Sequence, residues 1–467
     1  MGVERPNYSI MYLDRSAPSL ALPLAGRPCK GEGMFTHLHE PSFMQSPCVD
    51  ARHAARQLGY HATLRDSRCK NNKAIQSSHL MRAVSFIPDN RVALLHCGAE
   101  FFPALLAAID GAASEIYLET YIFGTDAIAT EVKAALGRAA VRGVAVNVVT
   151  DWIGTGRSRT ELLGQEFARD GIGHRVFNPW FRRGIARSHR KLCVVDQRLA
   201  FVGGINIIDD LQADDDSRQT LPLPRWDFAV QIEGPLVDAI HLEVEAQWFR
   251  LGNLKLRQRW ELFRDARTHL VPAGEQPILA AWLVRDNLRN RRTIQRAYLH
   301  ALGHARKKVV FANPYFAPGR KLRRALEQAA ARGVDVTLLL GVGQFKLQDA
   351  VARSFYPKLL KSGVKLVEYR KTQLHAKVAV VDDNWATIGS SNYDGLSLFV
   401  NQEANVVIRD PEFSNDLRAR IERGIADGVA VDFADYAHIR WYKRVWYGFA
   451  FLVYETLIRV VTWSKYT

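Results

Sequence analysis

Cysteine is scarce in this sequence, and the few cysteines present form no recognisable pattern. Five occur among 467 residues, with no C-x-x-C pair and no spacing typical of zinc ligands. This argues against a disulfide framework and against a zinc site. An odd and scattered set of cysteines is typical of a reducing compartment.

The sequence also lacks long apolar runs, and its acidic residues are fewer than its basic ones. No stretch approaches the roughly 18–20 uninterrupted apolar residues that a membrane-spanning helix needs, which excludes a polytopic membrane protein. Asp and Glu number 48 against 63 Lys and Arg, so the formal charge is +15. Such an excess favours an anionic partner, whether nucleic acid, phosphates or an acidic membrane surface.

Apolar residues as a whole are plentiful. They make up 48% of the chain, with 10 Trp and 22 Phe, which excludes wholesale disorder and indicates packed interiors in two or three domains. Residues 1–80 differ from the rest, because they show neither helical nor alternating periodicity. We predict that they form a disordered or loosely ordered extension, and that the native chain begins at Met81.

The remainder of the chain repeats itself. Residues 139–144 (AAVRGV) are echoed by residues 329–334 (AAARGV), and further landmarks recur at similar offsets. Each block ends a helical run with Arg-Gly and leads into a β-branched strand, at 144–150 and 334–340. Strands alternating with helices imply a parallel or mixed sheet covered by helices on both faces. We therefore predict a duplicated α/β fold, with domains at 81–265 and 266–430.

The strongest signal is a motif that occurs once in each half. Both copies read H-x-K-x4-D-x6-G-[GS]-x-N. Its fixed residues are His189, Lys191, Asp196 and Asn206 in the first copy, and His375, Lys377, Asp382 and Asn392 in the second. One copy arises by chance in roughly one such chain in ten thousand, so two copies in register exclude coincidence.

The spacing within the motif has a chemical meaning. His-x-Lys opens an apolar strand, so the two side chains share one face of it. A histidine beside an ammonium group suits phosphoryl chemistry, because one attacks phosphorus while the other neutralises a nonbridging oxygen. The small residues before Asn allow close backbone approach, and Asn supplies an amide donor. Asp196 and Asp382 lie an odd number of residues beyond Lys, so we expect them to brace the site.

The two motifs resemble those of the phospholipase D superfamily. Their flanks are similar to bacterial cardiolipin synthases, above all to the cardiolipin synthase B branch. The resembling segments are 118–123 (LETYIF), 201–206 (FVGGIN), 226–227 (WD), 232–235 (IEGP), 285–287 (RDN), 389–392 (GSSN) and 403–406 (EANV). Residues 393–395 (YDG) depart from the family, where Ile or Leu, Asp and Pro are more usual.

The resemblance implies two tandem α-β-α sandwich domains with pseudo-two-fold symmetry and one shared active site. It implies transfer of a phosphatidyl group between two phosphatidylglycerol molecules, with a phosphohistidine intermediate and release of glycerol. By analogy His189 is the nucleophile and His375 the acid and base, although the reverse stays open. The resemblance also implies phosphate-binding roles for Lys191, Lys377, Asn206 and Asn392, histidine-orienting roles for Asp227 and Glu403, and no metal or cofactor.

Two basic or apolar segments point to a membrane surface. In residues 431–467, a broad apolar face is interrupted by a narrow polar stripe, as in a helix that lies in the bilayer interface. The alternative is a terminal helix docked onto the second domain. Arg182, Arg183, Arg187 and Arg190 crowd the first motif, either as a solvated face or as a collector of anionic headgroups.

The same residues leave other activities open. A phospholipase D-type hydrolase would use water as the acceptor, and a nuclease would use the same chemistry on nucleic acid. The apolar terminal segment favours lipid, so we expect anionic phospholipids as substrates and no nucleic acid. We expect a peripheral protein on the cytoplasmic face of the inner membrane.

Overall fold

The structure is a computed structural model that describes residues 84–213, 219–252, 278–287, 290–434 and 438–463. The predicted extension, residues 1–80, and the predicted start at Met81 lie outside the described residues. Residues 81–467 group into one compact unit.

The described strands fall into two successive sets. The first set is β1 (Ile87–His96), β2 (Glu115–Thr120), β3 (Ala145–Asp151), β4 (Gly173–Phe177), β5 (Arg182–Ile185), β6 (Leu192–Val195), β7 (Leu199–Gly203) and β8 (Phe228–Glu233). The second set is β9 (Ile278–Arg285), β10 (Lys308–Asn313), β11 (Asp335–Gly341), β12 (Lys365–Tyr369), β13 (Val378–Val381), β14 (Trp385–Gly389), β15 (Glu403–Arg409) and β16 (Val429–Ala430).

The described helices alternate with these strands. In the first half they are α2 (Cys97–Asp110), α3 (Ala127–Val141), α4 (Arg157–Arg169), the short 3-10 helix η1 (Pro179–Phe181) and α5 (Leu236–Leu251). In the second half they are α7 (Thr293–His304), α8 (Arg320–Ala331), α9 (Lys346–Lys361), α10 (Gly395–Phe399) and α11 (Pro411–Ala426), followed by α13 (Trp441–Trp463).

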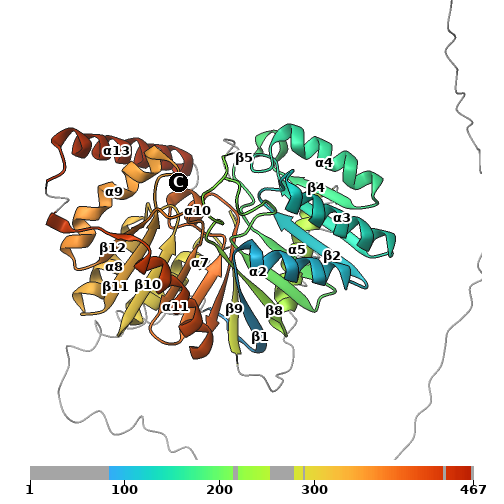
Figure 1. Ribbon diagram of the computed structural model, residues 1–467, viewed down its shortest axis with the longest axis horizontal. Coiled ribbons are helices and arrows are strands. Elements are labelled where there is room, and N and C mark those ends of the chain that lie inside the picture. Colours follow the sequence, from blue (N-terminus) through green and yellow to red (C-terminus); the bar gives the residue numbers. More distant parts are fainter. Residues whose placement is uncertain (1–83, 214–218, 253–277, 288–289, 435–437, 464–467) are drawn as a thin grey trace, which may run out of the picture. The chain divides into compact units, whose positions relative to one another are not determined.

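Fifteen of the described strands join in one mixed sheet whose order is symmetric about its centre. Outwards from β1 the order is β8, β7, β6, β2, β3 and β4, and outwards from β9 it is β15, β14, β13, β10, β11 and β12, with β16 at the edge. β1 and β9 pair antiparallel, with Ile87 opposite Ala280 (Figure 1). β2, β3 and β4 in the first half and β10, β11 and β12 in the second are parallel, whereas the inner strands and the edge strand β16 pair antiparallel. The predicted duplicated α/β fold is therefore confirmed.

The repeated Arg-Gly blocks end helices as predicted. α3 ends at Val141 and α8 at Ala331, and the glycine two residues later has φ of +90° at Gly143 and +87° at Gly333. Glycine tolerates this left-handed conformation without a Cβ clash, so the chain turns directly into the next strand. The strands begin at 145 and 335, one residue later than predicted.

Helices cover both faces of the sheet. On one face of the first half, Leu105, Val132 and Phe167 from α2, α3 and α4 pack on alternate strand residues such as Ile116 and Val148. Helices α7, α8 and α9 cover the corresponding face of the second half. The strands next to the motif are buried on both faces, since LCVV in β6 and VAVV in β13 are wholly buried.

The opposite face is a single core that both halves share. Helix α5 contributes Leu236 and α11 contributes Leu417, and both belong to one buried cluster with Val194 of β6 and Val380 of β13. Because this cluster crosses from one half to the other, the two copies of the fold are packed as one body. That packing fixes the two motifs relative to each other.

Helix α13 docks onto the second half by one side only. Ala450 is buried, the rings of Phe451 and Phe355 lie 5.4 Å apart, and Gly395 N donates to Tyr454 Oη at 2.6 Å. The other side exposes large apolar side chains, namely Val445, Trp446, Phe449, Leu452, Val453, Leu457 and Val460. Among the described helices, none has the length and apolar character needed to span a bilayer.

Candidate active site

Each motif histidine is held by a backbone bond to the other half of the chain. His189 lies just before β6, and its N–H donates to Gln402 O at 2.9 Å. His375 lies just before β13, and its N–H donates to Trp226 O at the same distance. The two acceptors directly precede Glu403 and Asp227. These crossed connections bring both motifs to the interface between the halves.

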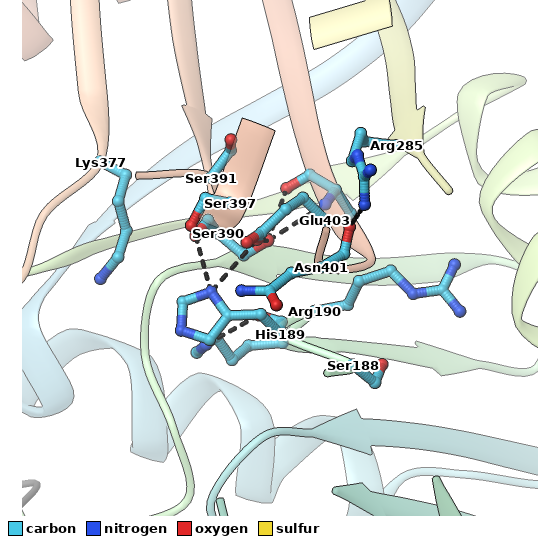
Figure 2. A network of polar contacts seen from close by, with 12 residues as sticks. Ser188, His189, Arg190, Arg285, Lys377, Ser390, Ser391, Ser397, Asn401 and Glu403 are labelled. Atoms are coloured by element: carbon cyan, nitrogen blue, oxygen red, sulfur yellow. Dashed lines mark hydrogen bonds and ion pairs between the residues drawn. The ribbon is translucent and has the colours of Figure 1, made fainter. Parts of the chain in front are cut away.

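The same crossing pairs each imidazole with a carboxylate. His189 Nδ1 lies 3.2 Å from Glu403 Oε2, and His375 Nδ1 lies 2.6 Å from Asp227 Oδ2 (Figure 2 shows the first pair). All four side chains are buried. A carboxylate that accepts the Nδ1 proton fixes the tautomer and leaves Nε2 for chemistry.

Burial and charge set the ionisation of these groups. Desolvation, helped by the Lys191 charge, holds the pKa of His189 below its ordinary value, although Glu403 opposes the shift. Burial alone raises the pKa of Glu403, but His189 and Lys191 outweigh it and hold that pKa low. For Asp227, Lys377 and His375 outweigh burial, and its pKa is also lowered. The site therefore holds two carboxylates and a neutral His189 at neutral pH.

Both motif lysines are buried beside their histidines. Lys191 Nζ donates to His189 O at 2.7 Å, and Lys377 Nζ donates to His375 O and lies 3.8 Å from Asp227 Oδ2. The Lys377 charge also lowers the pKa of His189, so the lysine of one half acts on the histidine of the other. Two desolvated ammonium groups beside the imidazoles can neutralise an anion such as a phosphate.

The two motif asparagines lie at the ends of the strands that follow the lysine strands. Asn206 Oδ1 accepts Ile122 N–H at 3.2 Å. Asn392 Oδ1 and the neighbouring Ser391 Oγ are buried and have no hydrogen-bond partner among the described residues. A buried polar atom without a partner is costly, and a bound phosphate would supply one.

The small residues of the motif make room for carboxylates. A Cβ on Gly204 would lie 2.3 Å from Asp227 Oδ1, so any side chain there would displace the carboxylate. The equivalent position in the second half is Ser390, whose Oγ donates to Glu403 Oε2 at 2.5 Å and whose O lies 3.0 Å from His189 Nδ1. The sequence predicted close backbone approach here, but did not reveal that the approaching group is the histidine's carboxylate.

Asp196 and Asp382 belong to the motif, and we expected them to brace the site; in the structure both accept hydrogen bonds from the backbone of their own half. Both follow the far ends of β6 and β13, with φ near +50°. Asp196 accepts backbone N–H groups of Ala113, Ser114 and Glu115 at 2.9, 2.7 and 3.0 Å. Asp382 does the same for residues 306–308. They brace the loops that lead into β2 and β10, away from the histidines.

Arg190 also differs from its expected place. It was grouped with an arginine cluster on a solvated face or a headgroup collector, but it is fully buried. Its Nε donates to Glu119 Oε1 at 3.1 Å and its guanidinium to Glu243 Oε1 at 3.0 Å. These two carboxylates make the burial of Arg190 possible, because an unpaired buried charge is strongly unfavourable. In the second copy the same position is Ala376.

Three further residues, to which the sequence assigned no role, hold the motif in position. Asp151 Oδ2 accepts Ser188 N–H at 2.8 Å, and burial raises the pKa of Asp151 to about 6. The Tyr121 ring lies 4.9 Å from the His189 ring, edge to face, with Lys191 Nζ 5.1 Å from its centroid. Arg285 donates to Asn401 O and so holds the segment before Glu403. Tyr121 and Arg285 lie in the segments 118–123 and 285–287 that resemble cardiolipin synthases, whereas Asp151 carries no sequence signal.

Within the described ranges, no three His, Cys, Asp or Glu side chains are grouped so that they could hold a metal ion.

Comparison with known proteins decides the family. A family model described as "Cardiolipin synthase, PLD-like domain" matches residues 105–212 and 298–425. The chain belongs to the phospholipase D-like cardiolipin synthase family. It is therefore an enzyme of the phospholipase D superfamily.

Individual relatives agree with this membership. Cardiolipin synthase B of Salmonella typhi is 39% identical over 341 residues, 71% of this chain and 80% of the relative. Cardiolipin synthase B of Escherichia coli is 37% identical over 371 residues, 78% and 86% respectively. Cardiolipin synthase 1 of Bacillus cereus is 28% identical over 360 residues, 74% and 67% respectively.

A solved structure supports the fold. The phosphatidylserine synthase of Haemophilus influenzae matches with a TM-score of 0.58 at 16% identity, covering 78% of this chain and 93% of that protein.

Proposed function

We propose that this enzyme is a cardiolipin synthase that transfers a phosphatidyl group from one phosphatidylglycerol to a second and releases glycerol. The observation that carries the proposal is the crossed arrangement of two buried histidines, each with its carboxylate from the other half and a lysine beside it. The relatives are cardiolipin synthases, which supports a phospholipid substrate for this enzyme.

The first half-reaction uses His189 as the nucleophile. Its Nε2 forms a bond to phosphorus while the bond from phosphorus to the glycerol oxygen breaks, and His375 gives a proton to that oxygen. The lowered pKa of His189 supports this role, since only the neutral ring attacks. An ionised Asp227 at 2.6 Å from His375 favours the protonated ring that an acid needs.

The second half-reaction reverses these roles. Neutral His375 takes the proton from a hydroxyl of the second phosphatidylglycerol, the oxygen attacks phosphorus, and the bond to His189 breaks. Lys191 and Lys377 neutralise the nonbridging oxygens throughout, with Asn206 and Asn392 as further partners of the phosphate. Glu403 and Asp227 stabilise the positive charge that each imidazole carries in turn.

We further propose that residues 81–265 and 266–430 act as one catalytic body, and that 431–467 attaches it to a membrane. The exposed apolar face of α13 supports a peripheral attachment, which we assign to the cytoplasmic face of the inner membrane. From the sequence, docking onto the second domain and exposure to the bilayer were alternatives. They are compatible, because they use opposite sides of the helix.

One experiment tests the reaction. Purified protein is incubated with phosphatidylglycerol vesicles, and the lipid and soluble products are separated. Cardiolipin together with glycerol supports the transferase, whereas phosphatidic acid without cardiolipin would show a hydrolase. His189→Ala and His375→Ala should each abolish turnover, and product formation by either variant would overturn the assignment.

A further inference from the structure

The segment just before His189 displays large apolar side chains to solvent. Trp180 is 55% exposed, Phe181 50% and Ile185 42%. These residues belong to η1 and β5, and residues 179–187 are called the aromatic–arginine loop below. In Figure 1, β5 and α13 both lie along the upper edge of the view. The loop therefore places exposed apolar groups at the end of the unit where α13 does the same.

The loop is held in a conformation that most residues avoid. Asn178, Trp180 and Phe181 have φ of 54°, 56° and 55°, which is unfavourable for bulky side chains. The Asn178 amide compensates, because its Nδ2 donates to Gly184 O at 2.7 Å and to Ala186 O at 2.8 Å. Strained backbone of this kind is retained mainly where it serves function. Here it keeps two aromatic rings on the outside.

Arginines accompany the exposed rings. The Arg157 guanidinium lies 4.2 Å from the centre of the Trp180 ring, and that of Arg187 lies 5.8 Å from the Phe181 ring. Arg182, which follows Phe181 in the chain, is also exposed. Aromatic rings beside arginines are typical of protein segments at the boundary between lipid headgroups and acyl chains. The positive charge suits anionic headgroups in particular.

The loop is also coupled to the histidine. Arg187 O accepts Gln402 N–H at 2.7 Å, and Gln402 O in turn accepts His189 N–H at 2.9 Å. The end of the loop is therefore fixed to the strand that carries Glu403. Because the loop ends two residues before His189, a surface bound by the loop would lie close to that histidine.

We propose that the aromatic–arginine loop is a second membrane-contact element, which inserts Trp180 and Phe181 among the headgroups of an anionic bilayer. This inference rests on the proposed function, because the loop would bring the lipid substrate from the bilayer to His189. The first half contacts the membrane through this loop and the second half through α13, so the shared site faces the lipid between them.

The test removes the apolar rings without touching the catalytic residues. The double variant Trp180→Ser/Phe181→Ser is compared with the wild type and with Val141→Ser, which removes a side chain 88% exposed at the end of α3. Each protein is sedimented with phosphatidylglycerol vesicles and with phosphatidylcholine vesicles. Turnover is measured on phosphatidylglycerol vesicles and on dihexanoyl phosphatidylglycerol below its micelle concentration.

We expect the double variant to bind phosphatidylglycerol vesicles about tenfold less tightly or worse, from the lost burial of two rings. Turnover on vesicles should fall in parallel, while turnover of the monomeric lipid stays at the wild-type rate. Val141→Ser should match the wild type throughout. Vesicle binding by the double variant equal to that of Val141→Ser would overturn the proposal.

A second variant covers the case in which the double variant does not fold. Arg182→Glu changes an exposed side chain and should weaken sedimentation with phosphatidylglycerol vesicles but not with phosphatidylcholine vesicles. Unchanged binding to both would count against the loop. Wild-type protein that sediments with vesicles but converts neither lipid contradicts the proposed function and leaves the loop's role as a membrane contact standing.

Discussion

At the scale of single residues, the site depends on charges that the protein has buried in pairs. Glu403 and Asp227 are almost completely buried, which is unfavourable for a carboxylate unless charged or hydrogen-bonded partners surround it. Each has an imidazole within 3.2 Å, and lysines lie nearby. The carboxylates thus stay ionised at positions where they would stabilise the imidazolium of each proposed half-reaction.

The first prediction concerns Glu403→Gln, which keeps the shape of the side chain and removes its charge. Turnover should fall by about 100-fold or more, because the imidazolium loses its counter-charge. The Glu403 charge raises the pKa of His189 in the wild type, against the lowering by burial and Lys191. Its removal should therefore move the acid limb of the kcat/KM profile to lower pH. The measurement is a pH–rate profile of both proteins.

The control is Glu422→Gln, which removes a partly exposed carboxylate that pairs with Lys308. Its profile should match that of the wild type, whose own acid limb should lie below the ordinary histidine value of about 6.5. An acid limb that moves to higher pH in Glu403→Gln would contradict the electrostatic account of the site.

At the scale of helices and strands, the repeated patterns of the sequence predicted much of the fold. The Arg-Gly helix ends, the apolar strands after the motif and the mixed sheet all follow from local periodicity and from glycine conformation. The motif also predicted that its two histidines and two lysines belong to the site. Local patterns decide such features because they depend on neighbours within a few residues.

The pairing of elements could not be predicted in the same way. No spacing indicates that His189 contacts Glu403, 214 positions away, instead of a carboxylate of its own half. Likewise the burial of Arg190 depends on Glu119 in β2 and Glu243 in α5, which meet it only after folding. Contacts between distant segments are set by the packing of the whole sheet, so they cannot be predicted from local patterns in a single sequence.

The second prediction separates the two sides of α13. Phe449→Glu/Leu452→Glu replaces two exposed apolar residues, so flotation with phosphatidylglycerol vesicles should fall while the unfolding temperature stays the same. Tyr454→Ala removes the hydroxyl that accepts Gly395 N–H, so it should lower the unfolding temperature instead. Flotation and thermal unfolding are measured on both variants. Unimpaired flotation of the glutamate variant would rule out α13 as an attachment.

At the scale of the whole molecule, the structure suggests that the halves cannot act or unfold separately. The sheet continues through β1 and β9, and the cluster formed by α5 and α11 contains strand residues of both halves. The two histidine–carboxylate pairs cross the same boundary. Loss of packing on either side would therefore separate a histidine from its partner in the other half.

The third prediction follows from this shared core. Leu236→Ala in α5 and Leu417→Ala in α11 each remove a fully buried side chain of the same cluster and should cost about 2–5 kcal/mol of unfolding free energy. Because the cluster joins the halves, each variant should shift one common calorimetric transition, whichever half it lies in. Leu162→Ala, at an exposed position of α4, is the matched control and should leave the transition in place. Two resolved transitions, with each variant shifting only its own, would mean that the halves fold independently and that the crossed site assembles only after both have formed.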